Sequence, residues 1–225
     1  MVSFFSMVWS SVGKKIMTGL TGVGLCLFII GHLAGNFSLL VSAEAFNLYT
    51  YKLFSLGGLL YVIEALLTLA FVLHAIVGIS IYLKKRKARP IDYIKVANAG
   101  GNSHKSISSV SMIWTGLILL VFLVLHLKTF KFGPYYETSI NGIIMRDLYR
   151  LVIEVYQQPS YVISYTVIMI LLGVHLRHGF WSAFQSLGVN HPRYSPVIYG
   201  FGIFFALVMA AGFILIPIWI YFTKQ

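Results

Sequence analysis

Five long apolar runs constrain the fold of this chain more than any other feature of its sequence. They cover roughly residues 16–41, 56–83, 107–127, 160–185 and 197–222. Each matches or exceeds the ~20 residues that a helix needs to cross a bilayer, and none alternates as a membrane-spanning strand of ~10 residues does. Only 10% of the residues are charged, whereas a soluble domain has about 25%. We therefore predict an all-α membrane protein, a bundle of five transmembrane helices that forms one domain over residues 1–225.

The distribution of basic residues predicts the orientation of this bundle. If the N-terminus is cytoplasmic, eleven of the 17 basic residues lie on the cytoplasmic side: Lys14, Lys15, Lys84, Lys85, Arg86, Lys87, Arg89, Lys95, Lys105, Arg177 and Arg193. Such an excess is typical of cytoplasmic loops, so the C-terminus is predicted outside. The net charge of +11 then faces anionic membrane lipid or a docked protein partner. Nucleic acid is not an expected partner, because these charges lie in short loops between spans.

The segment between the third and fourth runs has a different pattern. Over residues 145–156, charged residues occupy one side of a helical projection and apolar residues the other: Ile144, Leu148, Leu151, Val152 and Val155. This pattern predicts an amphipathic helix that lies along the outer surface of the membrane.

Four histidines lie inside the apolar runs, one in each of the first four: His32, His74, His126 and His175. An imidazole in hydrocarbon is costly unless its nitrogens are used. At 1.5 Å per residue, His32 and His126 lie roughly 25 and 31 Å from the cytoplasmic edge. His74 and His175 lie roughly 15 and 20 Å from it. The depths therefore predict an outer pair, His32 with His126, and an inner pair, His74 with His175.

Two histidines at one level suit the axial positions of a heme iron, because zinc and copper sites need more protein ligands. We therefore predict two heme b groups. Glycines near three of the histidines would leave space for a porphyrin edge: Gly31, Gly35, Gly78 and Gly179. Unligated histidines in polar helix contacts or in a proton path are the alternative. His178 and Arg177 are expected to face heme propionates or interfacial water. His104 and His191 are expected to be ordinary surface residues.

Several short motifs occur in a characteristic order along the chain. They are residues 11–15 (SVGKK), 32–36 (HLAGN), 74–78 (HAIVG), Arg89-Pro90 with Tyr93, and 175–181 (HLRHGFW). In order, spacing and topology, from about residue 10 to residue 222, the chain resembles the diheme cytochrome b anchors of succinate dehydrogenase and fumarate reductase. The resemblance is to the type that has five helices in a single anchor subunit.

The resemblance implies a multi-pass subunit of the bacterial cytoplasmic membrane. A flavoprotein subunit with FAD and an iron–sulfur subunit would dock on its cytoplasmic face and carry out the dicarboxylate chemistry. The chain would pass electrons between them and a membrane quinone, either menaquinone or ubiquinone. His74 and His175 would hold the inner heme, and His32 and His126 the outer heme. The basic loop 84–106, with Lys14 and Lys15, would then be the docking surface for the iron–sulfur subunit.

A quinone site needs an apolar slot near a heme and a group that exchanges protons. Glu44, just past the first run, and Glu64, the acid inside the second run, are the candidates. Two other functions stay open. One is a diheme cytochrome b that serves another membrane dehydrogenase, such as a hydrogenase or a formate dehydrogenase. The other is a hemeless transporter that uses the histidines as relays, although broken helices with more intramembrane acids would be expected of it.

Overall fold

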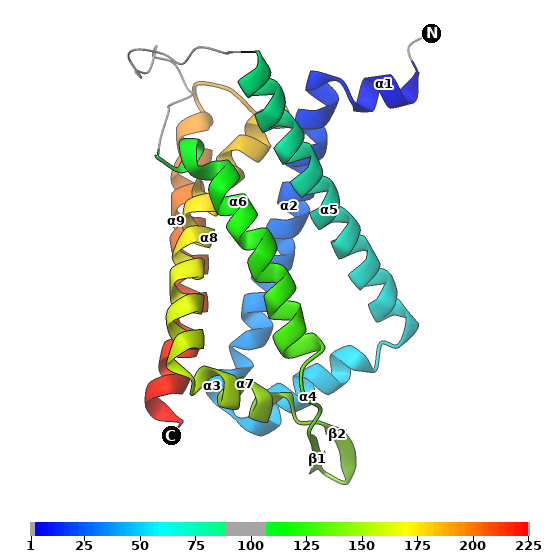
Figure 1. Ribbon diagram of the computed structural model, residues 1–225, viewed down its shortest axis with the longest axis vertical. Helices are drawn as coiled ribbons and strands as arrows, with labels where there is room; N and C mark the ends of the chain where they lie inside the picture. The colour runs from blue at the N-terminus through cyan, green and yellow to red at the C-terminus, as the bar shows by residue number, and fades with distance from the viewer. Residues whose placement is uncertain (1–2, 89–106, 225) are drawn as a thin grey trace.

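The structure is a computed structural model that describes residues 3–88 and 107–224, and within them it is almost entirely helical (Figure 1). Five helical segments of this part are long and apolar enough to span a membrane: Ser11–Val41, Gly58–Lys87, Ser108–Lys131, Pro159–Ser186 and Ser195–Thr223. Their bounds agree with the five predicted spans to within five residues. The all-α prediction of five membrane-spanning helices is therefore confirmed.

The spanning segments are built from six α-helices and one π-helix. They are α2 (Ser11–Asn36), α3 (Ser38–Val41), α5 (Gly58–Lys87), α6 (Ile107–His126), η1 (Leu127–Lys131), α8 (Pro159–Ser186) and α9 (Ser195–Thr223). Shorter elements lie at the two ends of the bundle. They are α1 (Phe4–Val8), α4 (Ala43–Phe54), β1 (Glu137–Ile140), β2 (Ile143–Arg146) and α7 (Leu148–Tyr156).

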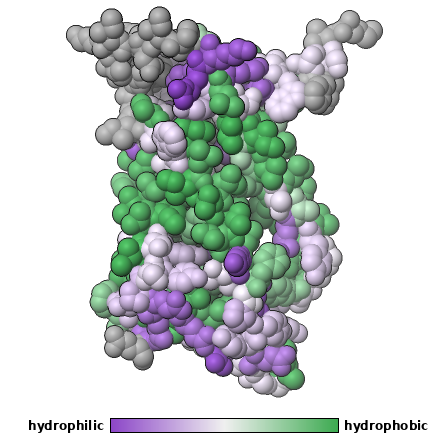
Figure 2. All heavy atoms as spheres, in the orientation of Figure 1, coloured by the Kyte–Doolittle hydropathy of each residue, from purple (hydrophilic) through white to green (hydrophobic). Residues whose placement is uncertain are grey.

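The N-terminal and C-terminal ends of the chain lie at opposite ends of the bundle (Figure 1). We name the end that carries α1 and the cluster Lys84–Lys87 the basic end, and the end that carries α4, the β-hairpin and α7 the hairpin end. A broad apolar band lies between two hydrophilic ends (Figure 2). This surface is the one expected of a multi-pass membrane protein. That the basic end faces the cytoplasm stays a prediction.

Side-chain caps decide where several helices begin. The Ser10 hydroxyl accepts a hydrogen bond from the backbone N–H of Gly13 at 3.0 Å, so α2 starts at Ser11, five residues before the predicted edge of the first span. Ser42 caps α4 in the same way through the N–H of Ala45. Both serines satisfy N–H groups that lack a partner in the first turn of a helix.

An amphipathic helix does occur at the hairpin end, with a later start than predicted, and its place on the outer membrane surface stays a prediction. Helix α7 buries Leu151, Val152 and Val155 against the end of the bundle. The prediction was wrong at Ile144, which lies on strand β2 with 70% of its surface exposed. Strands β1 and β2 form an antiparallel hairpin around Asn141-Gly142, where both residues have positive φ (52° and 77°). Asn-Gly is the preferred sequence for such a turn. The residues that follow it therefore form strand β2, and the helix begins only at Leu148.

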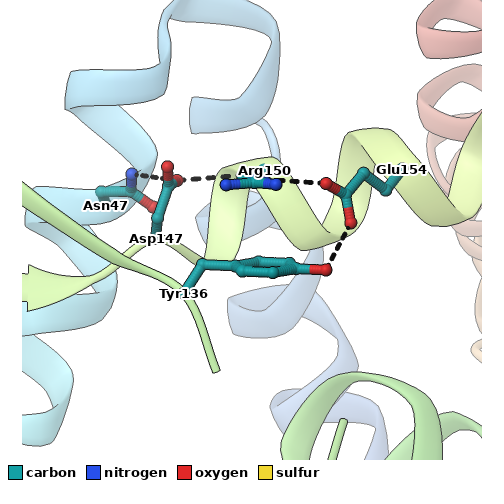
Figure 3. Close-up of polar contacts among 5 residues, drawn as sticks. All are labelled: Asn47, Tyr136, Asp147, Arg150 and Glu154. Carbon is teal, nitrogen blue, oxygen red and sulfur yellow. Dashed lines mark hydrogen bonds and ion pairs between the residues drawn. The ribbon is translucent and has the colours of Figure 1, made fainter. Parts of the chain in front are cut away.

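A network of polar contacts ties α4 to the segment that contains α7 (Figure 3). The Asn47 amide donates to Asp147 Oδ1 at 2.8 Å, and the same oxygen accepts from the backbone N–H of Arg150 at 3.0 Å. Arg150 Nε donates to one carboxylate oxygen of Glu154 at 2.8 Å, and the Tyr136 hydroxyl donates to the other at 2.7 Å. The hydrogen bond from Arg150, followed by that from Tyr136, holds the pKa of Glu154 below its ordinary value.

Close packing is concentrated on one side of the bundle. The buried apolar core involves α2, α3, α4, α7, α8 and α9, and its members run along the chain from Leu33 to Ile220. On α5 the one buried side chain of the described residues is Val77, and on α6 the buried side chains of the described part are two hydroxyl residues, Ser108 and Thr115. Helices α5 and α6 therefore contribute few fully buried apolar side chains to the bundle. Each of them carries one of the predicted ligand histidines.

Candidate functional site

The four intramembrane histidines lie in two separate pairs. The ring centroids of His32 on α2 and His126 on α6 are 5.9 Å apart, and those of His74 on α5 and His175 on α8 are 6.4 Å apart. The first pair lies toward the hairpin end, because His32 is four residues from the end of α2 and His126 is the last residue of α6. This pairing in space agrees with the pairing that depth along the helices predicts.

Both separations match two imidazoles that bind one metal ion from opposite sides. A ligating nitrogen lies about 2 Å from the metal and about 1.1 Å from its own ring centroid, which places the two centroids about 6.3 Å apart. The described residues contain no group of three or more His, Cys, Asp or Glu side chains that could hold a metal ion. Each pair therefore offers two ligands only, and the four nitrogens of a porphyrin would complete the coordination of an iron. The donor set fits heme.

Two threonines orient the pair nearer the basic end. Thr21 Oγ1 lies 3.2 Å from Nδ1 of His74, and Thr115 Oγ1 lies 3.0 Å from Nδ1 of His175. Each hydroxyl also donates to the backbone carbonyl four residues earlier in its own helix, at 2.7 and 3.1 Å. A hydroxyl has a single proton, so each oxygen accepts the Nδ1–H of the imidazole. The free lone pair of both rings is then on Nε2, the nitrogen that remains to bind a metal.

A glycine follows each of these threonines and lies against the same imidazole. A Cβ atom at Gly22 would lie 3.3 Å from Cε1 of His74, and a Cβ at Gly116 would lie 3.4 Å from Cε1 of His175. The two rings of the inner pair therefore rest on helix backbone. The two Thr-Gly pairs, one on α2 and one on α6, hold the His74 and His175 rings in the same way. Sequence reasoning did not assign a role to these four residues.

The pair toward the hairpin end has an aromatic surround. Nδ1 of His126 lies 3.2 Å from the Tyr165 hydroxyl, and the Phe130 ring lies 5.2 Å from the imidazole. His32 stacks on Phe28 with 5.4 Å between the ring centroids. The π-helical turn η1 begins directly after His126, and such turns are frequent at functional sites. This site is more apolar than the one toward the basic end.

The glycines predicted to leave room for a porphyrin edge differ in how much space lies beside them. Gly31 and Gly78 have no atom within 4 Å of an added Cβ, and Gly179 has only ordinary contact with Met112. The prediction was wrong at Gly35, where an added Cβ would lie 2.2 Å from the Tyr49 hydroxyl. Tyr49 of α4 fills that space, so Gly35 serves the packing of α4 against α2.

Arg177 and His178, predicted near propionates, lie on α8 toward the basic end. The Arg177 guanidinium donates to the Tyr199 hydroxyl at 3.0 Å and to Ser108 Oγ at 3.4 Å. Arg177 therefore links α8 to α9 and α6 and uses two of its five N–H donors in doing so. His178 is half-buried. Its predicted place beside a propionate or interfacial water stays a prediction.

The residues of the predicted docking surface differ in their exposure. Lys84–Lys87 and Lys15 are exposed at the basic end, and residues 89–106 of the predicted loop lie outside the described residues, His104 with them. The prediction was wrong for Lys14, which is buried and donates through Nζ to Ser80 on α5. A lysine turned inward in this way is not available to a docked subunit. His191 is exposed, as predicted.

The two candidate acids for quinone chemistry lie in different surroundings. Glu64, on α5, forms an ion pair with Lys131, the last residue of η1, and both side chains are about one-third exposed. Glu44 borders an open recess of about 400 Å³ at the hairpin end. That recess is lined mostly by polar residues: Ala43, Asn47, Thr138, Ser139, Ile140, Asn141 and Asp147. A polar recess does not meet the need of a quinone ring for an apolar slot, so the geometry counts against Glu44.

Comparisons with protein-family models, with curated proteins and with solved structures find no match to this chain.

Proposed function

We propose that this chain is the diheme cytochrome b membrane anchor of a succinate:quinone oxidoreductase, that is, of a succinate dehydrogenase or fumarate reductase. The observation that carries the proposal is the presence of two histidine pairs whose ring separations, 5.9 and 6.4 Å, suit one iron each. Five membrane-spanning helices are consistent with it. The resemblance of the sequence motifs to that family supplies the assignment to succinate and fumarate.

The residues of this chain would hold the two groups at different depths of the membrane. His74 and His175 would bind the inner heme b, and His32 and His126 the outer heme b. Bound heme supplies reversible one-electron chemistry at its iron. The protein contributes the axial nitrogens, the hydroxyl groups that fix the orientation of the inner imidazoles, and an apolar surround that excludes water. These features determine the reduction potentials and allow electrons to pass between the two ends of the bundle.

The proposed partners lie at the two ends of this path. The exposed cluster Lys84–Lys87 and Lys15 at the basic end would bind the iron–sulfur subunit, which joins the FAD flavoprotein, on the cytoplasmic face. At the hairpin end a membrane quinone, menaquinone or ubiquinone, would exchange electrons with the outer heme. Glu64 would exchange the protons, because its partner Lys131 lies five residues after His126. The membrane would be the bacterial cytoplasmic membrane.

The first experiment is to purify the chain from membranes and measure its heme b content. We expect two hemes per polypeptide and a reduced-minus-oxidised spectrum of low-spin bis-histidine heme. A quinol should reduce them, and co-purifying flavoprotein and iron–sulfur subunits should oxidise succinate. Hemes that co-purify instead with hydrogenase or formate dehydrogenase subunits would replace the succinate assignment. A chain without heme would contradict the electron-transfer function and favour a transporter.

The threonine contacts predict a shift in potential without loss of heme. In Thr115→Val the His175 Nδ1–H loses its acceptor, so Nε2 becomes a poorer donor to a ferric iron. We expect the midpoint potential of one heme to rise by tens of millivolts, since 30 mV is about 0.7 kcal/mol for one electron. A redox titration measures it, and Thr21→Val should shift the same heme. Thr68→Val is the matched control, because that exposed hydroxyl donates only to a carbonyl of α5. An unchanged potential in both inner variants would contradict the role of the hydroxyls.

A further inference from the structure

Lys14 is a buried cation near the basic end. Its side chain lies between α2 and α5, with 6% of the residue surface exposed. The ammonium group donates to Ser80 Oγ and lies 4.7 Å from the centre of the Trp9 ring. A hydroxyl and an aromatic face are neutral partners, and neither cancels the charge. A buried charge without a counterion is strongly unfavourable.

No carboxylate of the described residues forms an ion pair with this lysine. The two ion pairs found in that part of the chain are Lys131 with Glu64 and Arg150 with Glu154. The side chain that interacts electrostatically with Lys14 is instead another cation, Lys84. A buried cation with a second, exposed cation beside it indicates that an anion belongs next to Lys14.

The position of Lys14 relates it to the inner histidine pair. Lys14 and Thr21 are seven residues apart, so they lie on the same face of α2 about 10.5 Å apart along its axis. Thr21 contacts His74. Ser80 is six residues beyond His74 on α5, about 9 Å along that helix. Measured along the helix axes, the Lys14 and Ser80 positions therefore lie about 9 to 10 Å from the level of the inner histidine pair, toward the basic end and where α2 meets α5.

We propose that Lys14 and Ser80, with Lys84 beside them, form a carboxylate-binding site that holds a propionate of the heme bound by His74 and His175. A porphyrin propionate places its carboxylate about 8 to 9 Å from the iron, which matches the separation between the cation and the histidine pair. The charge-assisted hydrogen bonds of such a site are the strong ones. The inference rests on the proposed function, and it assigns to Lys14 the role that the sequence suggested for Arg177.

The test measures heme potentials in the purified full-length chain. Ferric heme carries one positive charge more than ferrous heme, so a nearby cation favours the reduced form. Lys14→Met should therefore lower the midpoint potential of one heme and leave the other unchanged. Ser80→Ala should shift the same heme in the same direction by less, and Lys14→Arg should restore it. Lys15→Met is the matched control, because it removes the same charge from the exposed neighbour.

Reconstitution with a modified heme identifies the anion. Apoprotein with and without the Lys14→Met substitution is loaded either with heme or with its dimethyl ester, which has no propionate charge. We expect the inner site of the unsubstituted chain to bind heme more tightly than the ester, because only heme carries the carboxylate that Lys14 would pair with, and we expect Lys14→Met to abolish this preference. An equal preference for heme over the ester with and without the substitution would overturn the proposal, and would indicate that the anion beside Lys14 is another group, such as a lipid phosphate. Two retained hemes with unmoved potentials would overturn this assignment alone, whereas a wild-type chain without heme would overturn the proposed function as well.

Discussion

Replacing His74 with alanine is expected to halve the heme content of the purified chain, from two hemes per polypeptide to one. The reason is that a heme held by a single imidazole on one face loses half of its axial ligation and the orientation that the second ligand provides. The same single heme should be lost from His175→Ala, because the two rings lie 6.4 Å apart in one pair. Heme b per polypeptide and the reduced-minus-oxidised spectrum give the answer.

Double substitutions test the pairing itself. His74→Ala combined with His175→Ala should still leave one heme, since both changes affect the same site. His74→Ala combined with His32→Ala should leave none, because the two changes fall in different pairs. His191→Ala is the control, since this exposed imidazole lies in the loop before α9 and should retain both hemes. If the first double variant loses both hemes and the second keeps one, the pairs are assigned wrongly.

The fold at the level of membrane spans could be predicted because hydrocarbon imposes a single strong rule. A helix satisfies all of its backbone groups internally, so an apolar run of sufficient length crosses the membrane as a helix. The predicted span 160–185 and the observed helix Pro159–Ser186 differ by one residue at each end. The first span begins earlier than predicted because Ser10 caps α2, a local effect that hydropathy does not contain.

The elements outside the membrane were predicted less well, because tertiary contacts and short turns determine them. Helix α4 was not predicted, although Ser42 caps it and Tyr49 packs over Gly35. Its side chain Asn47 is buried because it bonds to Asp147, which lies 100 residues away in sequence. The Asn141-Gly142 turn was a readable signal for the hairpin. This signal was missed because the apolar periodicity of residues 144–155 was interpreted as a helix.

The histidine pairs could be predicted because rise per residue converts position in a helix into depth. The contacts around them could not. Thr18-Gly19 and Thr21-Gly22 are the same dipeptide three residues apart, but only the second places its hydroxyl and its glycine against His74, which meets Thr18 through the backbone. Gly19 lies instead against the Ala183 carbonyl on α8. Which face of α2 meets α5 depends on how the helices pack, and the sequence pattern does not specify it.

The burial of Lys14 is a second feature that depends on helix packing and that the sequence pattern does not specify. Lys14 and Lys15 are chemically equivalent in sequence, and both count toward the basic side of the membrane. In the structure one is buried against Ser80 and the other is exposed. Consecutive side chains of α2 point about 100° apart around the helix axis, so only one of the two lysines faces α5. Charge counting therefore yields a predicted orientation of the bundle without distinguishing an exposed lysine from a buried one.

A large side chain at Gly22 is expected to remove the inner heme while leaving the helix intact. A Cβ at this position already lies 3.3 Å from Cε1 of His74, so the three further carbons of leucine would displace the imidazole. Leucine favours the helix over glycine by up to about 1 kcal/mol, so a weaker α2 cannot explain the loss. Gly22→Leu should retain one heme, and Gly22→Ala should retain two. Heme content and far-ultraviolet circular dichroism measure both effects.

Gly24→Leu provides the matched control for this prediction. Gly24 is two residues further along the same helix, and nothing lies within 4 Å of an added Cβ there, so both hemes should remain. On the facing side, Gly116→Leu should remove the same inner heme, because its Cβ would lie 3.4 Å from Cε1 of His175. A combined Gly22→Leu and Gly116→Leu chain should keep the outer heme. If Gly22→Leu retains two hemes with unchanged potentials, the His74 ring does not rest on α2 and the geometry of the inner site is different.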